Sequence, residues 1–410
     1  MSELLQLVEI DKVPNFFEGK LAVNLATEKI NITEAKGRLL ARDIISQIDL
    51  PPFSRSTMDG YAVKAADTYG ASESMPVYLD MVGEILMGEE AVQEIKAGQV
   101  VKIATGGMLP KGADAVVMVE YTEALGGEMI EVFKSVASRE NVVLKGEDID
   151  QGSLLLKQGH LLRAQDIGAL AGIGITEVEV FARPAVTVFS TGDELVVPEQ
   201  KPKLGQIRDI NTYLVGSLVE ESGGTVNYGG IIRDNKEELK NKIGANLKNS
   251  DLVILSGGSS VGTKDLTIEV LNELGEPGVL VHGISIKPGK PTILALIDNT
   301  PVIGLPGHPA SAMTVLKIVG TPIIQSLAGQ ELNQFQGSIS ARLSRNLASD
   351  KGREEYIRVK LVEEKGQLWA QPILGKSSLI TTMVEADGLV KIDLGKEGLD
   401  QGEEVQVLLF

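Results

Sequence analysis

Three carboxylates stand where a parallel sheet would bring acidic side chains together. Glu194, Asp234 and Asp265 each follow a stretch that is predicted to be a strand or its turn. Because ligands of open α/β sheets bind beyond the carboxyl ends of the strands, we expect the three side chains to lie along one rim. Three acids in such a place are costly unless a cation neutralises them, and oxygen ligands without Cys or His favour Mg²⁺. Asp234 and Asp265 also stand where helix N-caps belong, so each taken alone has a purely structural explanation.

Groups that could bind an anion are predicted at the same rim. Lys287 and Lys290 lie three residues apart, held between prolines and a glycine in SIKPGKP, although the pair could also be a solvated turn. Two glycine turns lead into helices, whose N-termini favour anions. The residues of these turns that we expect to contact a ligand are Ser256, Gly257, Gly258, Ser259 and Gly262 in the first, and Pro306, Gly307 and His308 in the second. The rim is therefore predicted to hold a nucleotide or pyrophosphate ligand together with Mg²⁺.

The first glycine turn nearly matches the P-loop pattern but departs from it at its end. The P-loop needs a lysine that reaches the phosphates, followed by a hydroxyl for Mg²⁺, whereas here Thr263 precedes Lys264. ATP hydrolysis of the P-loop type is therefore not expected.

Alternating strands and helices are predicted to position these groups. From residue 183 onward, buried apolar runs such as 252–255 alternate with helical patterns such as 211–221, 235–247 and 264–274. This alternation is typical of an open, mostly parallel α/β sheet. A further apolar helix is expected over 312–327.

The rest of the chain has a different pattern, and we predict a multidomain α/β plus β fold. Residues 31–43 are expected to form a helix followed by an extended exit, whereas 76–135 and the chain beyond 330 show short strands and turns. The predicted parts are an N-terminal mixed domain (1–50 and 146–182), an inserted β-rich domain (51–145), the α/β domain (183–329) and a C-terminal β-barrel-like domain (330–410).

The composition excludes several classes of function. The 410 residues carry a net charge of −17 without a basic tail, which argues against nucleic acid and anionic membrane as partners. There is no cysteine and there are only three histidines, so thiolate metal sites and multi-histidine zinc sites are not expected. Acids replace the basic region of a signal peptide, and no apolar run approaches the roughly 18 residues of a membrane span, so a cytoplasmic protein is expected.

Two polar loops in the first half of the chain carry further candidates. Asp59 lies in DLPPFSRSTMDGYAV and Thr105 in ATGGMLP. Asp59 could simply be part of a turn, and the hydroxyl of Thr105 could bind an anion or cap its own turn.

Eight motifs together carry a family resemblance. They are DLPPFSRSTMDGYAV, ATGGMLPKGADAVVMVE, GEDI, STGDEL, IIRDN, SGGSSVGTKD, IKPGKP and GLPGHPAS. In this order and spacing the chain resembles the molybdopterin molybdenumtransferases, the MoeA family that includes the gephyrin E domain. The resemblance runs from near residue 4 to the C-terminus.

The resemblance implies a reaction and a set of roles. The enzyme would take adenylylated molybdopterin from an upstream adenylating enzyme, release AMP with Mg²⁺, and insert molybdate into the pterin dithiolene. Glu194, Asp234 and Asp265 would surround the metal, and Lys287 and Lys290 would contact phosphate and molybdate. A homodimer with a shared cleft is implied, in which Asp59 and Thr105 reach in from the partner chain. Ser377, in GKSSL, would lie near the molybdate.

Two other functions compete with this hypothesis. A molybdopterin adenylyltransferase would share the α/β domain, but it would not need the inserted and C-terminal domains. A gephyrin-like dimeric scaffold without catalysis would have no need of the carboxylates and lysines. An adenylyltransferase would consume ATP, whereas a scaffold would turn over nothing.

Overall fold

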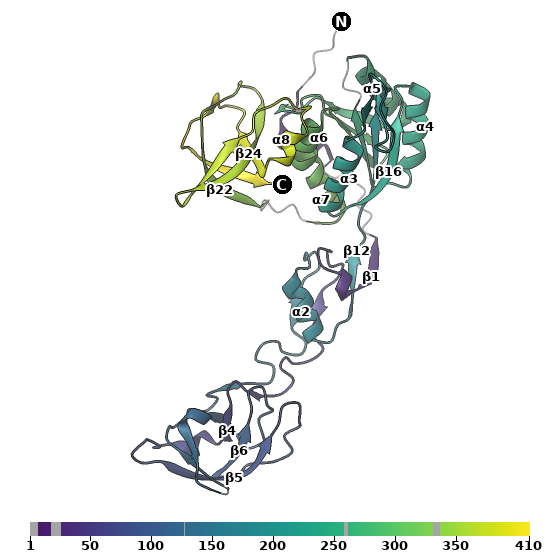
Figure 1. Cartoon of the computed structure of the whole chain (residues 1–410). Helices are drawn as coiled ribbons and strands as arrows, with labels where there is room; N and C mark the ends of the chain where they lie inside the picture. The colour runs from purple at the N-terminus through teal and green to yellow at the C-terminus, as the bar shows by residue number, and fades with distance from the viewer. Residues whose placement is uncertain (1–6, 18–25, 127, 258–260, 331–336) are drawn as a thin grey trace. The chain divides into compact units, whose positions relative to one another are not determined.

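The computed structural model describes residues 7–17, 26–126, 128–257, 261–330 and 337–410, without the side chains of residues 15 and 261–265. The chain forms two compact units (Figure 1). Unit 1 comprises residues 1–28, 37–39 and 180–410, and unit 2 comprises residues 29–36 and 40–179.

A six-stranded mixed sheet forms the centre of unit 1. Its strand order is β16-β13-β17-β21-β20-β18, and only β20 runs against the other five strands. The strands are β13 (Ala185–Thr191), β16 (Thr225–Ile232), β17 (Leu252–Gly257), β18 (Pro277–His282), β20 (Ile293–Ile297) and β21 (Thr300–Leu305). The predicted open, mostly parallel sheet is confirmed.

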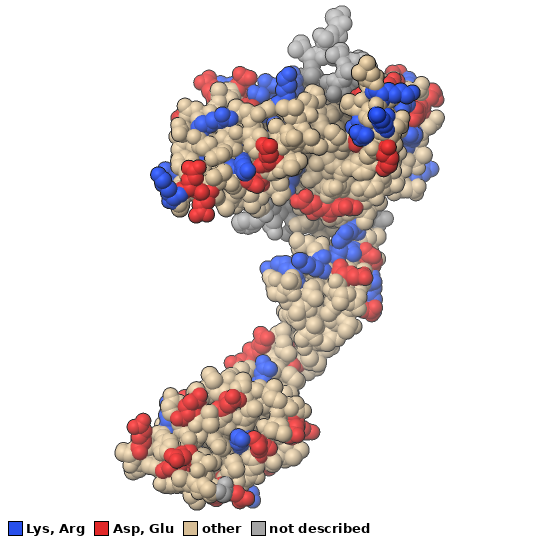
Figure 2. Space-filling model, in the orientation of Figure 1, with Lys and Arg blue, Asp and Glu red and all other residues tan. Residues whose placement is uncertain are grey.

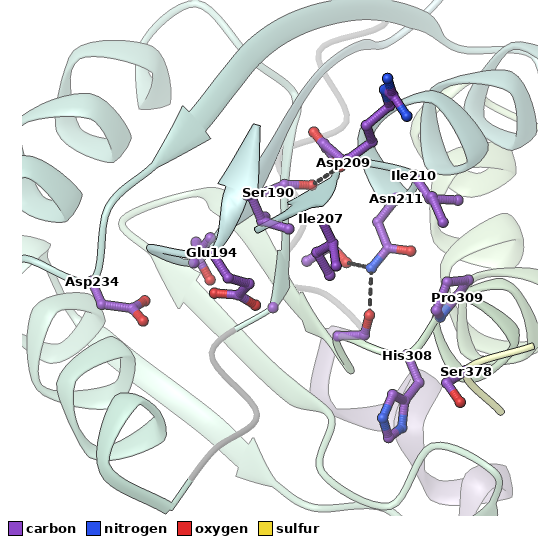
Figure 3. A pocket seen from close by; sticks show the side chains of 17 residues that line it. Ser190, Glu194, Ile207, Asp209, Ile210, Asn211, Asp234, His308, Pro309 and Ser378 are labelled. Atoms are coloured by element: carbon purple, nitrogen blue, oxygen red, sulfur yellow. Dashed lines mark hydrogen bonds between the residues drawn. The ribbon is translucent and has the colours of Figure 1, made fainter. Parts of the chain in front are cut away.

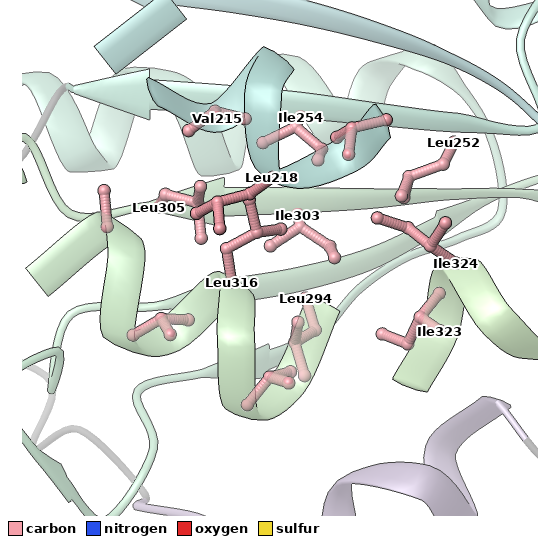
Figure 4. Packing of buried hydrophobic residues seen from close by; sticks show 14 of the residues in the cluster. Val215, Leu218, Leu252, Ile254, Leu294, Ile303, Leu305, Leu316, Ile323 and Ile324 are labelled. Carbon is pink, nitrogen blue, oxygen red and sulfur yellow. The ribbon is translucent and has the colours of Figure 1, made fainter. Parts of the chain in front are cut away.

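Helices cover both faces of this sheet, which explains the continuous apolar runs in its strands. Leu252 and Ile254 of β17 pack into one core and Val253 and Leu255 into the other, because successive side chains of a strand point to opposite faces. Figure 4 shows the first core, which lies under α3 and the α6–α7 region. The helices are α3 (Asn211–Glu221), α4 (Lys236–Leu247), α5 (Val261–Leu274), α6 (Pro309–Val315) and α7 (Thr321–Leu327).

The apolar helix expected over 312–327 extends over Pro309–Leu327 and contains a π-helical turn, η5 (Leu316–Gly320). Pro322 in the next turn has no N–H for the α-helical ladder, which accounts for an interruption here. Among the described residues this is the one helix long and apolar enough to cross a membrane, but it is mostly buried inside unit 1. It is therefore the core helix of the α/β domain.

The C-terminal strands close into a five-stranded barrel around their own core, as predicted. The ring runs β24-β25-β22-β28-β26 and returns to β24. A short strand of the α/β domain, β19 (Ile286–Lys287), pairs with β24 and joins the two parts. The barrel strands are β22 (Ser338–Leu343), β24 (Glu354–Glu364), β25 (Gln367–Pro372), β26 (Gly388–Ile392) and β28 (Glu404–Leu409), and the shorter elements of this region are β23 (Leu347–Ala348), α8 (Thr381–Val384) and β27 (Gly398–Leu399).

Unit 2 contains a six-stranded β sheet and a short helix, α2 (Ala164–Gly172). The sheet has the order β7-β4-β6-β5-β9-β8. Its strands are β4 (Gly60–Val63), β5 (Val77–Ile85), β6 (Gln99–Ile103), β7 (Ala115–Met118), β8 (Thr122–Ala124) and β9 (Met129–Val132). Smaller pairs are β1 (Thr27–Asn31) with β12 (Glu177–Phe181), β2 (Ile44–Ile45) with β11 (Leu154–Leu156), and β3 (Arg55–Ser56) with β10 (Val142–Val143).

The prediction of a helix at the start of residues 31–43 is wrong. Only one 3₁₀ turn, η2 (Ile32–Glu34), forms there, with the side chain of Asn31 accepting from the N–H of Thr33. Gly37 then takes a left-handed conformation at φ +76°, which ends any helical path.

Acidic and basic side chains are interspersed over the face of the molecule that Figure 2 shows. This face has no broad basic surface of the kind that binds nucleic acid.

Candidate active site

A cavity of about 490 Å³ opens in unit 1 beyond the carboxyl ends of β13 and β17 (Figure 3). Its lining comes from the turn after each strand, from the start of α3 and from a loop of the C-terminal domain. The lining residues are Ser190, Thr191, Gly192, Glu194, Leu195, Ile207, Arg208, Asp209, Ile210, Asn211, Asp234, Ser256, Gly257, Gly307, His308, Pro309 and Ser378.

One side of the cavity is acidic. Glu194 and Asp234 both line it, and the N–H of Asp234 donates to the carboxylate of Asp193 at 3.3 Å. Burial, and then the charges of Asp193 and Glu194, raise the pKa of Asp234. Arg233 leaves these charges unneutralised, because its guanidinium donates to backbone carbonyls at Gly192, Asp193 and Leu195.

This acidic side fits a divalent cation. Among the described side chains, no basic group forms an ion pair with Asp193, Glu194 or Asp234, and the guanidinium of Arg233 is engaged by backbone carbonyls. Two carboxylates completed by substrate phosphate oxygens are an arrangement that Mg²⁺ accepts. Within the side chains that the structure describes, no three acids or histidines form a group that could hold a metal ion.

Several predicted site residues lie outside the described part of the structure. These are Gly258 and Ser259, together with the side chain of Asp265. Gly262, which is predicted in the glycine turn, lies instead in the first turn of α5. Their predicted roles stay predictions.

The described part of the first glycine turn belongs to the cavity. Gly257 has φ +126°, and a Cβ there would lie 2.2 Å from the carbonyl oxygen of Thr191. Only glycine therefore fits at the end of β17. Ser256, buried beside it, accepts a hydrogen bond of 2.7 Å from the amide of Asn211.

The start of α3 contributes residues that the sequence interpretation did not single out. The buried carboxylate of Asp209 accepts from the hydroxyl of Ser190 at 2.7 Å and from the N–H of Thr212 at 3.1 Å. The side-chain N–H groups of Asn211 donate to Ser256 and to the carbonyl oxygen of Gly307. The sequence feature that could have identified them is the presence of Asp209 and Asn211 at the predicted helix start. Polar residues at such positions are usually explained as helix caps.

The second glycine turn meets a loop of the C-terminal domain. Gly307 and His308 line the cavity, whereas Pro306 is buried behind them. The hydroxyl of Ser377 lies 3.1 Å from Nδ1 of His308, and its carbonyl accepts from the N–H of Ala310. Ser378, the next residue, lines the cavity itself.

The predicted lysines are not among the lining residues. The ammonium of Lys287 lies 3.0 Å from the carboxylate of Glu355, and the backbone carbonyl of Lys290 accepts from the N–H of Ile284. A different cation lies behind the Ser377 loop. The buried guanidinium of Arg358 donates to the carbonyl of Gly375 at 3.2 Å, while its Nε has no partner among the described residues.

Burial without an acidic partner lowers the pKa of Arg358. Arginine is common on barrel strands, so nothing in the sequence alone set this one apart.

Asp59 and Thr105 lie together in unit 2. The N–H and the hydroxyl of Thr105 both donate to one oxygen of Asp59, at 2.7 and 3.0 Å, and they lower its pKa. The adjacent Gly60 allows close strand pairing, since a Cβ there would lie 1.9 Å from the carbonyl oxygen of Val117. The pair is exposed, and its predicted role in a site stays a prediction.

Comparisons with known proteins cover nearly the whole chain. Family models match for the MoeA N-terminal region, domains I and II (residues 5–174), a probable molybdopterin binding domain (187–326) and the MoeA C-terminal region, domain IV (340–410). The chain is 33% identical to the molybdopterin molybdenumtransferase of Nostoc sp. over 394 residues, which cover 95% of this chain and 90% of that protein. It is also 33% identical to the enzyme of the same name from Haemophilus influenzae, over 98% of this chain and 99% of that protein.

A solved structure gives the same result. The molybdopterin biosynthesis MoeA protein from Pyrococcus horikosii is 40% identical, with a TM-score of 0.82 over 98% of this chain and 99% of that one. The chain belongs to the MoeA family of molybdopterin biosynthesis proteins.

Proposed function

We propose that this protein is a molybdopterin molybdenumtransferase, which releases AMP from adenylylated molybdopterin and inserts molybdate into the pterin dithiolene. The observation that carries the proposal is one cavity that combines an uncompensated acidic side, a glycine turn and a hydroxyl-bearing loop. The family membership and the two named relatives support the reaction.

The acidic side would hold the divalent cation of the reaction. Glu194 and Asp234, with Asp265 as the predicted third ligand, would bind Mg²⁺ together with oxygens of the substrate phosphates. A bound Mg²⁺ neutralises phosphate charge and favours departure of AMP. Without it, the two carboxylates would repel the substrate, so binding of metal and nucleotide should be mutually dependent.

Molybdate is an anion, so positive charge and hydrogen-bond donors are needed where it approaches the dithiolene. The hydroxyls of Ser377 and Ser378 and the ring of His308 can donate hydrogen bonds to an oxyanion there. Arg358 supplies an unpaired positive charge behind this loop. Lys287 and Lys290 remain proposed contacts, but Lys287 would have to exchange Glu355 for the ligand.

We further propose a homodimer in which Asp59 and Thr105 complete the cavity of the partner chain. The hydrogen bonds from Thr105 orient the exposed carboxylate of Asp59, which leaves it accessible to a second chain. An upstream adenylating enzyme would supply the substrate, and the cytoplasm is the expected compartment.

A reconstituted assay tests the function. Adenylylated molybdopterin, Mg²⁺ and molybdate are supplied, and AMP release and molybdenum cofactor are both measured. AMP release that depends on molybdate supports the proposal. Consumption of ATP with unadenylylated molybdopterin would identify an adenylyltransferase instead, and no turnover of either substrate would leave a scaffold.

A further inference from the structure

Asn211 carries an acceptor atom that the described protein leaves unused. The residue is only 7% exposed, and no described residue donates a hydrogen bond to its Oδ1. A buried acceptor without a donor is costly and uncommon in folded proteins, so this atom is a candidate for a hydrogen bond from a ligand.

The orientation of this amide is set by its other end. Nδ2 donates to the carbonyl oxygen of Gly307 at 2.8 Å and to the hydroxyl of Ser256 at 2.7 Å. A carbonyl oxygen can only accept, so turning the amide over would place two acceptors against each other. Oδ1 must therefore point the other way, and Figure 3 shows it directed between Ile210 and Pro309.

The residues around Oδ1 indicate which kind of ligand group could donate a hydrogen bond to it. Ile210 and Pro309, between which Oδ1 is directed, contribute apolar surface to the lining of the cavity. The nearby carboxylate of Asp209 carries negative charge, so an anion is disfavoured here. A flat apolar ring that bears an N–H donor matches both features.

We propose that Asn211 Oδ1 accepts a hydrogen bond from the exocyclic amino group of a substrate heterocycle, whose ring packs against Ile210 and Pro309. This inference rests on the proposed function, because adenylylated molybdopterin carries two such rings, a 2-aminopterin and an adenine. The chemistry is shared by both rings, and the test distinguishes them. Asn211 is thus a specificity residue, separate from the metal-binding side of the cavity.

The experiment compares ligands that differ by one amino group. Dissociation constants are measured for pterin against 4-oxopteridine, which lacks only the 2-amino group, and for AMP against purine riboside monophosphate, which lacks only the 6-amino group. The intact protein should prefer the amino form of one pair by about 10-fold, equivalent to one hydrogen bond. The pair that shows the preference identifies the ring that occupies the subsite.

Variants at Asn211 then connect the preference to this atom. Asn211→Leu, of similar volume, should bind both members of the pair within about 2-fold of each other. Asn211→Asp is not a useful variant, because it would lose both Nδ2 donors and place an acceptor against the carbonyl oxygen of Gly307. Asn227→Ala is the matched control, since Asn227 pairs with Thr187 and Asn246 away from the cavity. This control should keep the full preference.

The ratio of two affinities is insensitive to a loss of folded protein. No preference in the wild type for either pair, or a preference that Asn211→Leu retains, would overturn the proposal. Molybdate-dependent AMP release without any amino preference rejects the subsite alone. A preference without AMP release supports the subsite and rejects the proposed reaction.

Discussion

Asp234 in unit 1 and Asp59 in unit 2 are both candidate active-site acids, but the protein treats them in opposite ways. Asp59 receives two hydrogen bonds from Thr105, which lower its pKa. Asp234 is half-buried beside Asp193 and Glu194, and its pKa is raised. The difference indicates that hydrogen bonds within unit 2 stabilise the ionised form of Asp59, whereas the described surroundings of Asp234 disfavour its ionised form.

The largest expected effect comes from removing the uncompensated charge. Asp234→Asn should lower Mg²⁺-dependent AMP release by about 100-fold or more, because a ligand of the cation that faces the reacting phosphate is lost. Initial rates over a Mg²⁺ titration measure it. Asp298→Asn, in an exposed turn outside the cavity, is the matched control and should act as wild type. Equal rates for both variants would contradict the assignment of Asp234.

A glycine in each region is expected to be irreplaceable for steric reasons. Gly257→Ala and Gly60→Ala would place a Cβ 2.2 and 1.9 Å from backbone oxygens, and each should lower the free energy of unfolding by about 2–4 kcal/mol. Denaturant unfolding followed by Trp369 fluorescence reports on unit 1, and circular dichroism reports on both units.

Gly168 provides the control for these glycine variants. It lies in α2 with open space where the methyl group of an alanine would lie, so Gly168→Ala should leave the protein as stable or stabilise it by about 0.5–1 kcal/mol. A Gly257→Ala protein of wild-type stability would show that the turn at the end of β17 is not constrained.

Removal of the hydroxyl that donates to Asp59 should lower the reaction rate less than removal of Asp234. Thr105→Val removes the hydroxyl donor to Asp59 but leaves the N–H donor, and we expect about a 10-fold lower rate of AMP release. The folded pKa of Asp59 is lowered, so its stabilising contribution is present above the unfolded value of 3.8 and is lost as the pH falls through the folded value. Thermal unfolding between about pH 5 and pH 3 should therefore be less pH-dependent in the variant. An unchanged profile would contradict this interpretation.

The smallest expected effect is on stability, and it is a gain: the variant that loses activity should be the more stable protein. The folded pKa of Asp234 is raised, so its contribution to stability is present below the unfolded value of 3.8 and lost as the pH rises through the folded value. At neutral pH without metal, Asp234→Asn should therefore slightly raise the melting temperature of the protein. Added Mg²⁺ should stabilise the wild type more than the variant. A variant that melts below the metal-free wild type would show that Asp234 is already satisfied.

Regular periodicity made most of the fold predictable. The helix at Asn211–Glu221 and the strand at Thr225–Ile232 have the expected bounds. The helix buries one apolar face, whereas the strand is buried only at Ile232 and is delimited by the turns on either side of it. The helix expected at the start of residues 31–43 fails because a cap and a left-handed glycine outweigh apolar spacing. The reversed strand β20 had no sequence signal of its own direction, since direction is decided by its neighbours.

The site residues that could be predicted are those that directly follow a strand, because the topology of the sheet sets where they lie. Glu194 and Asp234 follow strands of one sheet, and both line one cavity. The importance of Asn211 and Arg358 lies in the absence of described partners for particular buried atoms, which is a property of the tertiary structure. Lys287 lies in a motif that predicts a contact with phosphate. Its observed partner is Glu355, 68 residues away in the chain, which no local pattern predicts.

The central claim is that the uncompensated acids of one chain work with the Asp59 turn of a second copy. Its most direct test mixes two inactive variants, Asp234→Asn and Asp59→Ala, under conditions that exchange subunits. Each mixed dimer would contain one cavity with both residues intact, so AMP release should return to about a quarter of the wild-type rate. A mixture that stays as inactive as its separate components would contradict a shared site.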